Sequence, residues 1–248
     1  MHRMMGPIPL FQGSRLANNR FTAFGQSATL TAKEKKYMSN VEKALQSFES
    51  VEEWADYIAF LAKLQKSLHT NPDKENTNWI PYDFQVSIML SKCLAPSLPS
   101  GVHKKTIELY SNIFDILKET NLSQSITLWL PGIFPLMSYA SISIKQDLLN
   151  LFSNYICNVE PIYLRSCFKS ILLSLLPALD DTTSEFFNPT IDLIEKLKIQ
   201  LDDVNHFWQC ILLSIITSPD KRTGAMEYLT RKFPLFKVLG GTENLNKD

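Results

Sequence analysis

YSNIF, residues 110–114, recurs 42 residues later in altered form as FSNYI, residues 152–156. Both segments lie in amphipathic stretches that follow a more apolar stretch and a proline-containing turn. Apolar positions keep the same register over a further 42 residues, at Ile107, Leu109, Leu149, Leu151, Ile191, Leu193 and Ile194. A unit of two helices and about 42 residues is typical of HEAT and armadillo repeats. The sequence therefore predicts an all-α, right-handed α-solenoid of about five HEAT/armadillo-like helix pairs.

The segments outside this repeat also have helical periodicity. In residues 41–68, apolar side chains return every three or four positions, and Ser50 with Glu53 resembles a capping box between two helices. Sustained two-residue alternation and Asn-Gly or Asp-Gly hairpin turns are absent from the sequence. A compact α-helical bundle is the alternative to a solenoid.

Composition divides the chain into three parts. Residues 1–33 contain Arg3, Arg15, Arg20 and Lys33 but no acidic residue, which predicts a disordered tail. A mitochondrial transit peptide has a similar composition, so a mitochondrial helical protein with a cleaved presequence is an alternative. We expect the helical repeat domain to cover residues 34–237 and a flexible end to cover residues 238–248.

The charge balance argues against a bulk polyanion binder. The 25 basic and 25 acidic residues give a formal net charge of zero, so we expect no nucleic-acid partner. Four cysteines in apolar segments, without C-x-x-C spacing, predict reduced core thiols rather than disulfides or a zinc site. The most apolar stretch, residues 166–179, is shorter than the roughly 20 residues of a membrane span and contains Lys169 and Pro177.

Signatures of catalysis are weak. The chain lacks the glycine-rich, HExxH and GxSxG motifs, and its four histidines have no metal-ligand spacing, so we expect no enzyme, metal or cofactor. His206 and Cys210 are four residues apart on one helix face, but the surrounding segment is apolar and predicts packing rather than a catalytic dyad. We expect Trp54, Trp129 and Trp208 to lie in the core, because they fall in apolar stripes.

Basic side chains open several predicted helices, where the macrodipole disfavours positive charge. In LPSGVHKK, residues 98–105, three such residues occupy one helix start, and the 42-residue register places Lys145 opposite His103. If the pairs stack regularly, these residues and free N–H groups form one edge that favours anions. The candidate headgroup-binding residues are His103, Lys104, Lys105, Lys145, Lys221 and Arg222. A solvated rim is the alternative.

The chain resembles the N-terminal domain of the Dopey family over roughly residues 37–237. The resemblance is carried by WADYIAFLAKLQKSL (54–68), LAPSLPSGVHKKTIELYSNIF (94–114), LWLPGIFPLMSYASISIK (128–145), SEFF (184–187) and WQCILLSIITSPDKRTGAMEYLTRKFP (208–234). It implies a fragment of a large, non-enzymatic, cytoplasmic protein that is peripheral on Golgi, trans-Golgi-network and endosome membranes. Endosome-to-Golgi transport and organelle morphogenesis are the implied functions.

The same resemblance implies partners. They are a large scaffold resembling Arf guanine-nucleotide exchange factors, phospholipid flippases, kinesin motors and, for the N-terminal region, phosphatidylinositol 4-phosphate. No family motif fixes the lipid-contacting residues, so the six cations remain our prediction from the repeat. A scaffold that binds only protein partners, without direct lipid binding, is the alternative function.

Overall fold

The computed structural model describes residues 30–72 and 78–233, and over these ranges it contains helices and no strand. The α-helices are α2 (Ala32–Gln46), α3 (Trp54–Leu68), α4 (Asp83–Cys93), α5 (Ser100–Trp129), α6 (Leu136–Tyr139), α7 (Ile142–Asn154), α8 (Pro161–Leu175), α9 (Phe187–Leu201), α10 (Val204–Thr217) and α11 (Arg222–Lys232). Short 3₁₀ segments follow several of them: η1 (Ser47–Ser50), η2 (Ile156–Asn158), η3 (Leu176–Leu179) and η4 (Pro219–Lys221). The predicted all-α class is confirmed for the described residues.

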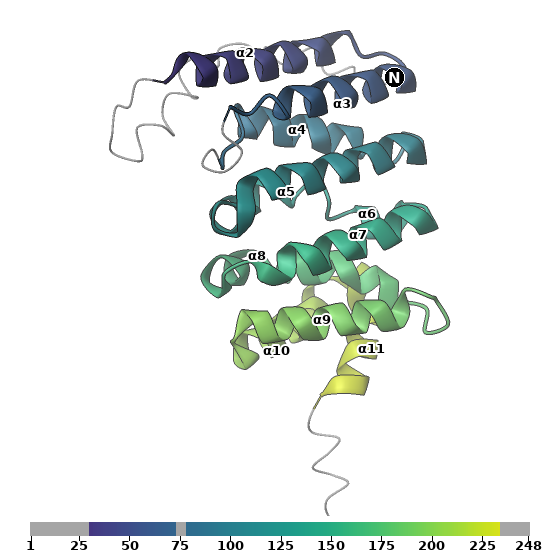
Figure 1. Ribbon diagram of the computed structural model, residues 1–248. Coiled ribbons are helices and arrows are strands. Elements are labelled where there is room, and N and C mark those ends of the chain that lie inside the picture. The colour runs from purple at the N-terminus through teal and green to yellow at the C-terminus, as the bar shows by residue number, and fades with distance from the viewer. Residues whose placement is uncertain (1–29, 73–77, 234–248) are drawn as a thin grey trace, which may run out of the picture.

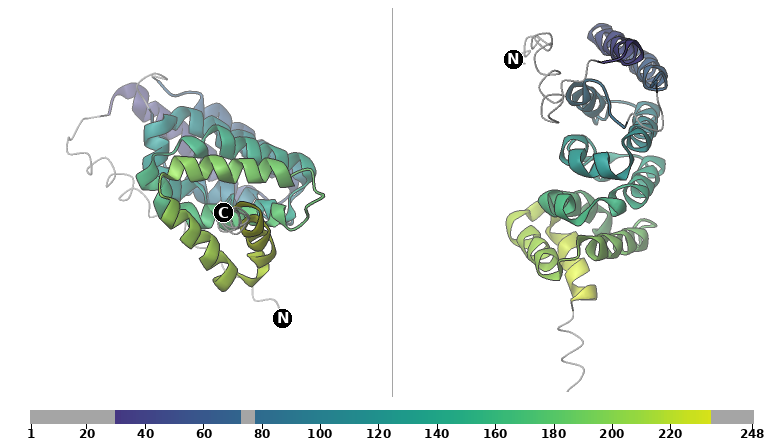
Figure 2. Two further views of the ribbon diagram at one scale, coloured as in Figure 1. Left: turned by 90° about the horizontal axis from the view of Figure 1, so that it is seen from below. Right: turned by 60° about the vertical axis from the view of Figure 1, so that its left-hand side comes forward.

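The helices stack in two layers along one long axis (Figures 1 and 2). In one layer α3, α5, α7 and α9 contact one another in that order; in the other, α6 contacts α8 and α8 contacts α10. Helices adjacent in the chain, such as α4 and α5 or α8 and α9, join the layers. This extended arrangement is consistent with an α-solenoid.

Hydrogen bonds between neighbouring repeats reproduce the period that the sequence predicted. They join residues separated by 40 to 43 positions in Tyr155 to Asp115 (2.7 Å), Ser87 to Leu128 (2.6 Å), Gln200 to Val159 (2.8 Å) and Asn121 to Asn78 (2.7 Å). The apolar register is also confirmed, because Ile107, Leu149 and Ile191 are all buried, on α5, α7 and α9. Each repeat therefore buries its apolar face against the next one.

Helix α5 is two helices joined at a break. Lys118 has φ 56° and ψ 176°, which no residue within a regular helix adopts. Beyond this break, residues 119–129 lie against the other layer, where Leu128 accepts the hydrogen bond from Ser87 of α4. Helix α5 ends at Trp129, and after Pro131 and Pro135 the chain forms only the short helix α6 before α7 begins at Ile142.

The segment Pro161–Leu179, which comprises α8 and η3, is long and apolar enough to cross a membrane by length and composition alone. From the sequence, the apolar stretch over residues 166–179 was expected to be too short for a membrane span. Within the structure 56% of the segment's most apolar window is buried, and α8 packs against α5, α9 and α10. Its apolar composition is accounted for by this packing in the helical stack.

The helical domain begins slightly earlier than predicted. Helix α2 starts at Ala32, behind a capping box in which Thr31 and Glu34 bond each other's backbone N–H groups. The predicted Ser50–Glu53 box is replaced by one between Glu53 and Asp56 at the start of α3. The remaining tail, residues 1–29, and the predicted flexible end, residues 238–248, lie outside the described residues.

Candidate functional site

Helices α3, α5, α7 and α9 run in the same direction, so their N-termini line one edge of the stack (Figure 1). Lys104 and Lys105 lie in the first two turns of α5, and Lys145 lies in the first turn of α7. These three lysines therefore lie near the same edge of the stack. We call Lys104, Lys105 and Lys145 the lysine edge.

The backbone at the starts of α5 and α7 leaves room for an anion. Neither α5 nor α7 has an acidic residue in its first turn, and neither has a side-chain hydrogen bond from its N-cap, Pro99 or Ser141. The first N–H groups of these helices therefore keep their positive field, and the lysines add to it.

The neighbouring helix α3 starts differently. Asp56 accepts hydrogen bonds from the backbone N–H groups of Glu53 (2.9 Å) and Glu52 (3.2 Å). These bonds hold the pKa of the Asp56 carboxyl below its usual value. The start of α3 is thus already occupied by a carboxylate of the chain itself, unlike the starts of α5 and α7.

His103 was wrongly predicted as a headgroup ligand. Only 4% of its surface is exposed, and its Nε2 lies 2.9 Å from the carbonyl oxygen of Ala95 in the loop before α5. Its ring also meets the edge of the Tyr139 ring, at 5.9 Å between centroids. His103 is buried because it lies four and seven residues before Ile107 and Tyr110, and this spacing places all three on the same buried face of α5. The histidine fixes a loop and does not face solvent.

Lys104 and Lys105 remain accessible but lie close to carboxylates. Lys105 forms an ion pair of 3.1 Å with Glu108, one turn further along α5. Lys104 borders a shallow groove of about 200 Å³ between α5 and α7, whose other polar walls are Glu108, Ser111, Asp147, Asn150, Asn154 and Tyr155. An exposed ion pair of this kind contributes less than about 1 kcal/mol, so Lys105 can exchange Glu108 for an external anion.

Lys145 is half-buried near the start of α7. Within residues 30–72 and 78–233, neither Lys145 nor Lys104 takes part in an ion pair. These two lysines are therefore the strongest candidates for an anion within the lysine edge.

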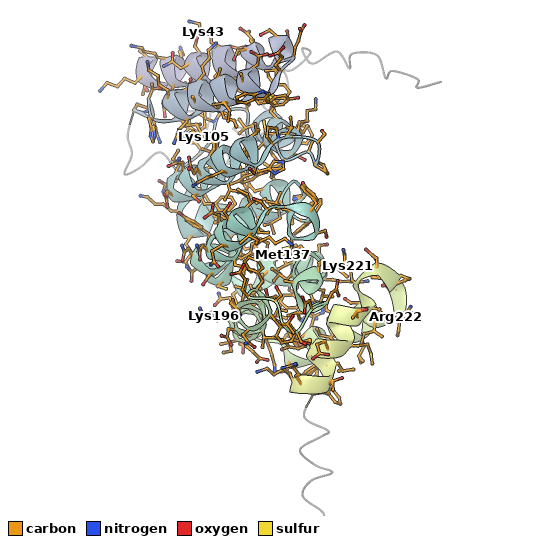
Figure 3. All side chains as sticks on the ribbon, turned by 90° about the vertical axis from the view of Figure 1, so that its right-hand side faces the viewer. Lys43, Lys105, Met137, Lys196, Lys221 and Arg222 are labelled. Carbon is orange, nitrogen blue, oxygen red and sulfur yellow. The ribbon has the colours of Figure 1, made fainter. Side chains whose placement is uncertain are left out.

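Lys221 and Arg222 lie apart from the lysine edge. Figure 3 shows Lys105 on one side of the molecule and Lys221 and Arg222 on the other. Lys221 reaches Asp220 at 3.4 Å and Ser138 at 3.3 Å, and Arg222 donates to the carbonyl oxygen of Ile215 at 2.8 Å. Both side chains thus link η4 and α11 to the stack. The predicted cations therefore do not form one row, because Lys221 and Arg222 lie on a different side from the lysine edge.

Exposed apolar residues accompany the lysine edge, and sequence reasoning missed them. Trp54, the first residue of α3, is 61% exposed, and Ile142, the first residue of α7, is 66% exposed. Trp54 was predicted to be buried, which is wrong, whereas Trp129 is fully buried as expected. The available signal was the three-residue spacing of Glu53 and Asp56, a capping-box pattern that makes Trp54 the first residue of the helix.

His206 and Cys210, the pair considered above as a catalytic dyad, do not have the chemistry of one. Cys210 Sγ lies 3.6 Å from His206 Nε2, but the thiol is buried, and burial raises its pKa. A nucleophilic cysteine requires the opposite shift. Among the described residues, no group of three or more His, Cys, Asp or Glu side chains could hold a metal ion.

Comparison with known proteins identifies related chains. The family model described as "Dopey, N-terminal" matches residues 31–246. Protein DOP1 of Saccharomyces cerevisiae is 43% identical over 83% of this chain, Protein dop1 of Emericella nidulans 38% over 93%, and Protein DOP1B of Mus musculus 37% over 77%. The chain spans only 12%, 13% and 8% of these three relatives. No solved structure matches it significantly.

Proposed function

Because the chain belongs to the Dopey family, we propose that it is a non-enzymatic adaptor in endosome-to-Golgi transport and in the organisation of both organelles. In this proposal the helical stack is a right-handed solenoid of about five HEAT/armadillo-like pairs. It docks reversibly on the cytoplasmic face of Golgi and endosome membranes through phosphatidylinositol 4-phosphate. The protein partners are a large scaffold resembling Arf exchange factors, a flippase and a kinesin.

The observation that carries the lipid contact is the lysine edge. Its helix starts lack acidic residues and side-chain caps, and exposed Trp54 and Ile142 lie along the same edge. A phosphorylated headgroup suits the lysines and N–H groups, while an indole and an aliphatic side chain suit the membrane interface. His103 has no part in this contact, and Lys221 and Arg222 lie on another side of the molecule.

The energetics imply a weak contact that needs a second anchor. A cation near an anionic membrane contributes about 1 kcal/mol, so three lysines give only about 3 kcal/mol. Stable recruitment then requires a simultaneous contact with a protein partner. Once one contact has formed, the other takes place at a high effective concentration, so two weak interactions together give tight binding.

Liposome co-sedimentation at physiological salt tests the lipid contact. We expect the wild-type chain to pellet with vesicles containing phosphatidylinositol 4-phosphate more than with phosphatidylserine or neutral vesicles. Lys104→Glu/Lys105→Glu should weaken this binding by roughly tenfold or more, because two favourable charges become unfavourable. A matched control is Lys35→Glu/Lys36→Glu, which reverses two adjacent exposed lysines at the start of α2, on the opposite edge (Figure 1).

The control must bind like wild type, and circular dichroism must show the same helix content in all three proteins. Equal pelleting of wild type and the Lys104/Lys105 variant, or no pelleting of either, would contradict the lipid contact.

The groove beside Lys104 favours a second candidate, a scaffold that binds only protein. Lys104 and the carboxylates of Glu108 and Asp147 line it together, a mixture of charges that suits a peptide segment. In that case Glu108→Ala/Asp147→Ala would abolish capture of the scaffold partner, while vesicle binding would be absent in all variants.

A further inference from the structure

The groove between α5 and α7 has two polar walls, and each wall follows the period of its helix. The wall residues are separated by three or four positions, so each set lies on one face of its helix and extends over about 10.5 Å. Ile107 and Leu151, which are both buried, line the groove between the walls. The walls consist of Lys104, Glu108 and Ser111 on α5 and of Asp147, Asn150 and Asn154 on α7.

A hydrogen bond between the two helices bounds one end of the groove. The Tyr155 hydroxyl, at the end of α7, donates to Asp115 of α5 at 2.7 Å. The other end reaches Lys104, near the start of α5. The volume of about 200 Å³ is smaller than the roughly 300–1,000 Å³ of small-molecule pockets. A short piece of extended chain therefore suits the groove better than a small molecule does.

Polar groups on the α7 wall have no partner within the chain. Among residues 30–72 and 78–233, the half-buried carboxylate of Asp147 and the carboxamide of Asn154 form no hydrogen bond or ion pair. Asn150 accepts one hydrogen bond, from Gln146 at 3.2 Å, and its own N–H groups donate none within the same ranges. Because burial of a charge without a partner is costly, the Asp147 carboxylate favours a cationic group from outside the chain.

The spacing of the two asparagines matches that of an extended main chain. Asn150 and Asn154 are four residues apart, so they are separated by about 6 Å along α7. In an extended chain, groups on the same side recur every two residues, or about every 6.7 Å. Each carboxamide offers a donor and an acceptor, which are the two groups that a main-chain peptide unit requires. The two asparagines can therefore bond successive same-side residues of an extended segment.

We propose that the groove binds an extended peptide segment of a protein partner. The main chain of the segment lies on Asn150 and Asn154, and an arginine side chain of the segment pairs with Asp147. Arginine suits this position because its planar guanidinium bonds a carboxylate through two parallel N–H groups. This inference rests on the protein-binding role proposed above for the groove and specifies the segment that is bound. It does not require contact between the lysine edge and a membrane.

Selection from a random peptide library displayed on phage tests the groove, with the full 248-residue chain as the target. We expect the enriched peptides to contain arginine and to bind the wild-type chain when synthesised, as measured by fluorescence anisotropy. Asn150→Ala/Asn154→Ala and Asp147→Asn should each weaken this binding by about tenfold or more, because each removes hydrogen bonds to the peptide.

Matched control variants remove the same chemical groups outside the groove. Asn188→Ala/Asn205→Ala changes two exposed asparagines on α9 and α10, and Asp192→Asn changes an exposed carboxylate on α9. Both controls should bind the peptides like wild type, and circular dichroism must show the same helix content in all the proteins.

Replacing the peptide's arginine with neutral citrulline tests the pairing with Asp147. Citrulline should weaken binding to the wild-type chain as much as Asp147→Asn does, and it should weaken binding to Asp147→Asn no further. Purely additive effects of the two changes would show that the arginine does not contact Asp147 and would overturn this pairing.

Two results would overturn the proposal as a whole. One is a selection that enriches no arginine-containing peptide, and the other is equal binding of the enriched peptides to wild type and to Asn150→Ala/Asn154→Ala. Capture of the scaffold partner by a chain that carries Asn150→Ala/Asn154→Ala would likewise contradict the groove and leave the adaptor role standing. Vesicle binding should be the same in wild type and this variant, so a failure of the lipid contact is measured separately.

Discussion

At the scale of single residues, buried hydroxyl groups divide into satisfied and unsatisfied ones. The Tyr110 hydroxyl is buried and has no hydrogen-bond partner among the described residues, whereas the Tyr228 hydroxyl donates to Glu195 at 2.6 Å. An unpaired buried polar group costs about 1–3 kcal/mol, and a hydrogen bond to a charged group contributes about 1.5–3 kcal/mol.

The two tyrosines should therefore respond oppositely to the same substitution. Tyr110→Phe should raise the free energy of unfolding by about 1 kcal/mol, and Tyr228→Phe should lower it by about 2 kcal/mol. Urea denaturation followed by circular dichroism measures both values. The prediction fails if the two variants shift the midpoint in the same direction.

The residue scale also shows why the six predicted cations do not share one exposed surface. Lys104, Lys105 and Lys145 could be placed from the repeat register, which depends on spacing alone. Spacing alone could not distinguish the buried His103 from the accessible lysines. The distinction requires knowing which face of α5 is buried, and the apolar residues Ile107 and Tyr110 mark that face. Lys221 and Arg222 were placed wrongly because their position depends on η4, which connects α10 to α11. The direction of that connection cannot be predicted from the repeat period.

At the scale of elements, the break within α5 sets the boundary between two repeats. Lys118 has a positive φ, a conformation that costs a non-glycine residue about 1–2 kcal/mol. Glycine adopts this region without a steric penalty. Sequence reasoning missed the break because lysine carries no signal for a positive φ, whereas the proline-marked turns were recognised correctly.

Lys118→Gly should consequently stabilise the chain by about 1 kcal/mol or leave its stability unchanged. Lys196→Gly, in the middle of the regular helix α9, should destabilise it by about 1 kcal/mol. Thermal denaturation of the two variants against wild type distinguishes them. Equal destabilisation by both substitutions would show that the backbone at Lys118 is helical in solution.

At the scale of the whole molecule, buried cysteine thiols and tyrosine hydroxyls are spread along the helical stack. Burial raises the pKa of Cys93 to about 12 and that of Cys167 to about 11, from an ordinary value of 9.0. It also raises the pKa of Tyr37 and Tyr110 far above their ordinary 10.0. Between the ordinary and the raised values, the unfolded chain releases protons that the folded chain retains.

Folding stability should therefore be fully present below about pH 9 and fall as the pH rises further, because each folded-state pKa is raised. Each such group adds a slope of about 1.4 kcal/mol per pH unit to the pH dependence of the unfolding free energy in this window.

Tyr110 isolates one of these contributions, because its hydroxyl is fully buried. Above pH 10, Tyr110→Phe should reduce the pH dependence of the unfolding free energy by about that slope, as measured by urea denaturation at pH 8 to 11.5. Since this variant also begins from a higher stability at pH 8, its advantage over wild type should widen with pH. A constant difference between the two proteins would mean that the Tyr110 hydroxyl ionises as easily in the folded stack as in the unfolded chain, and that the repeats open at this point.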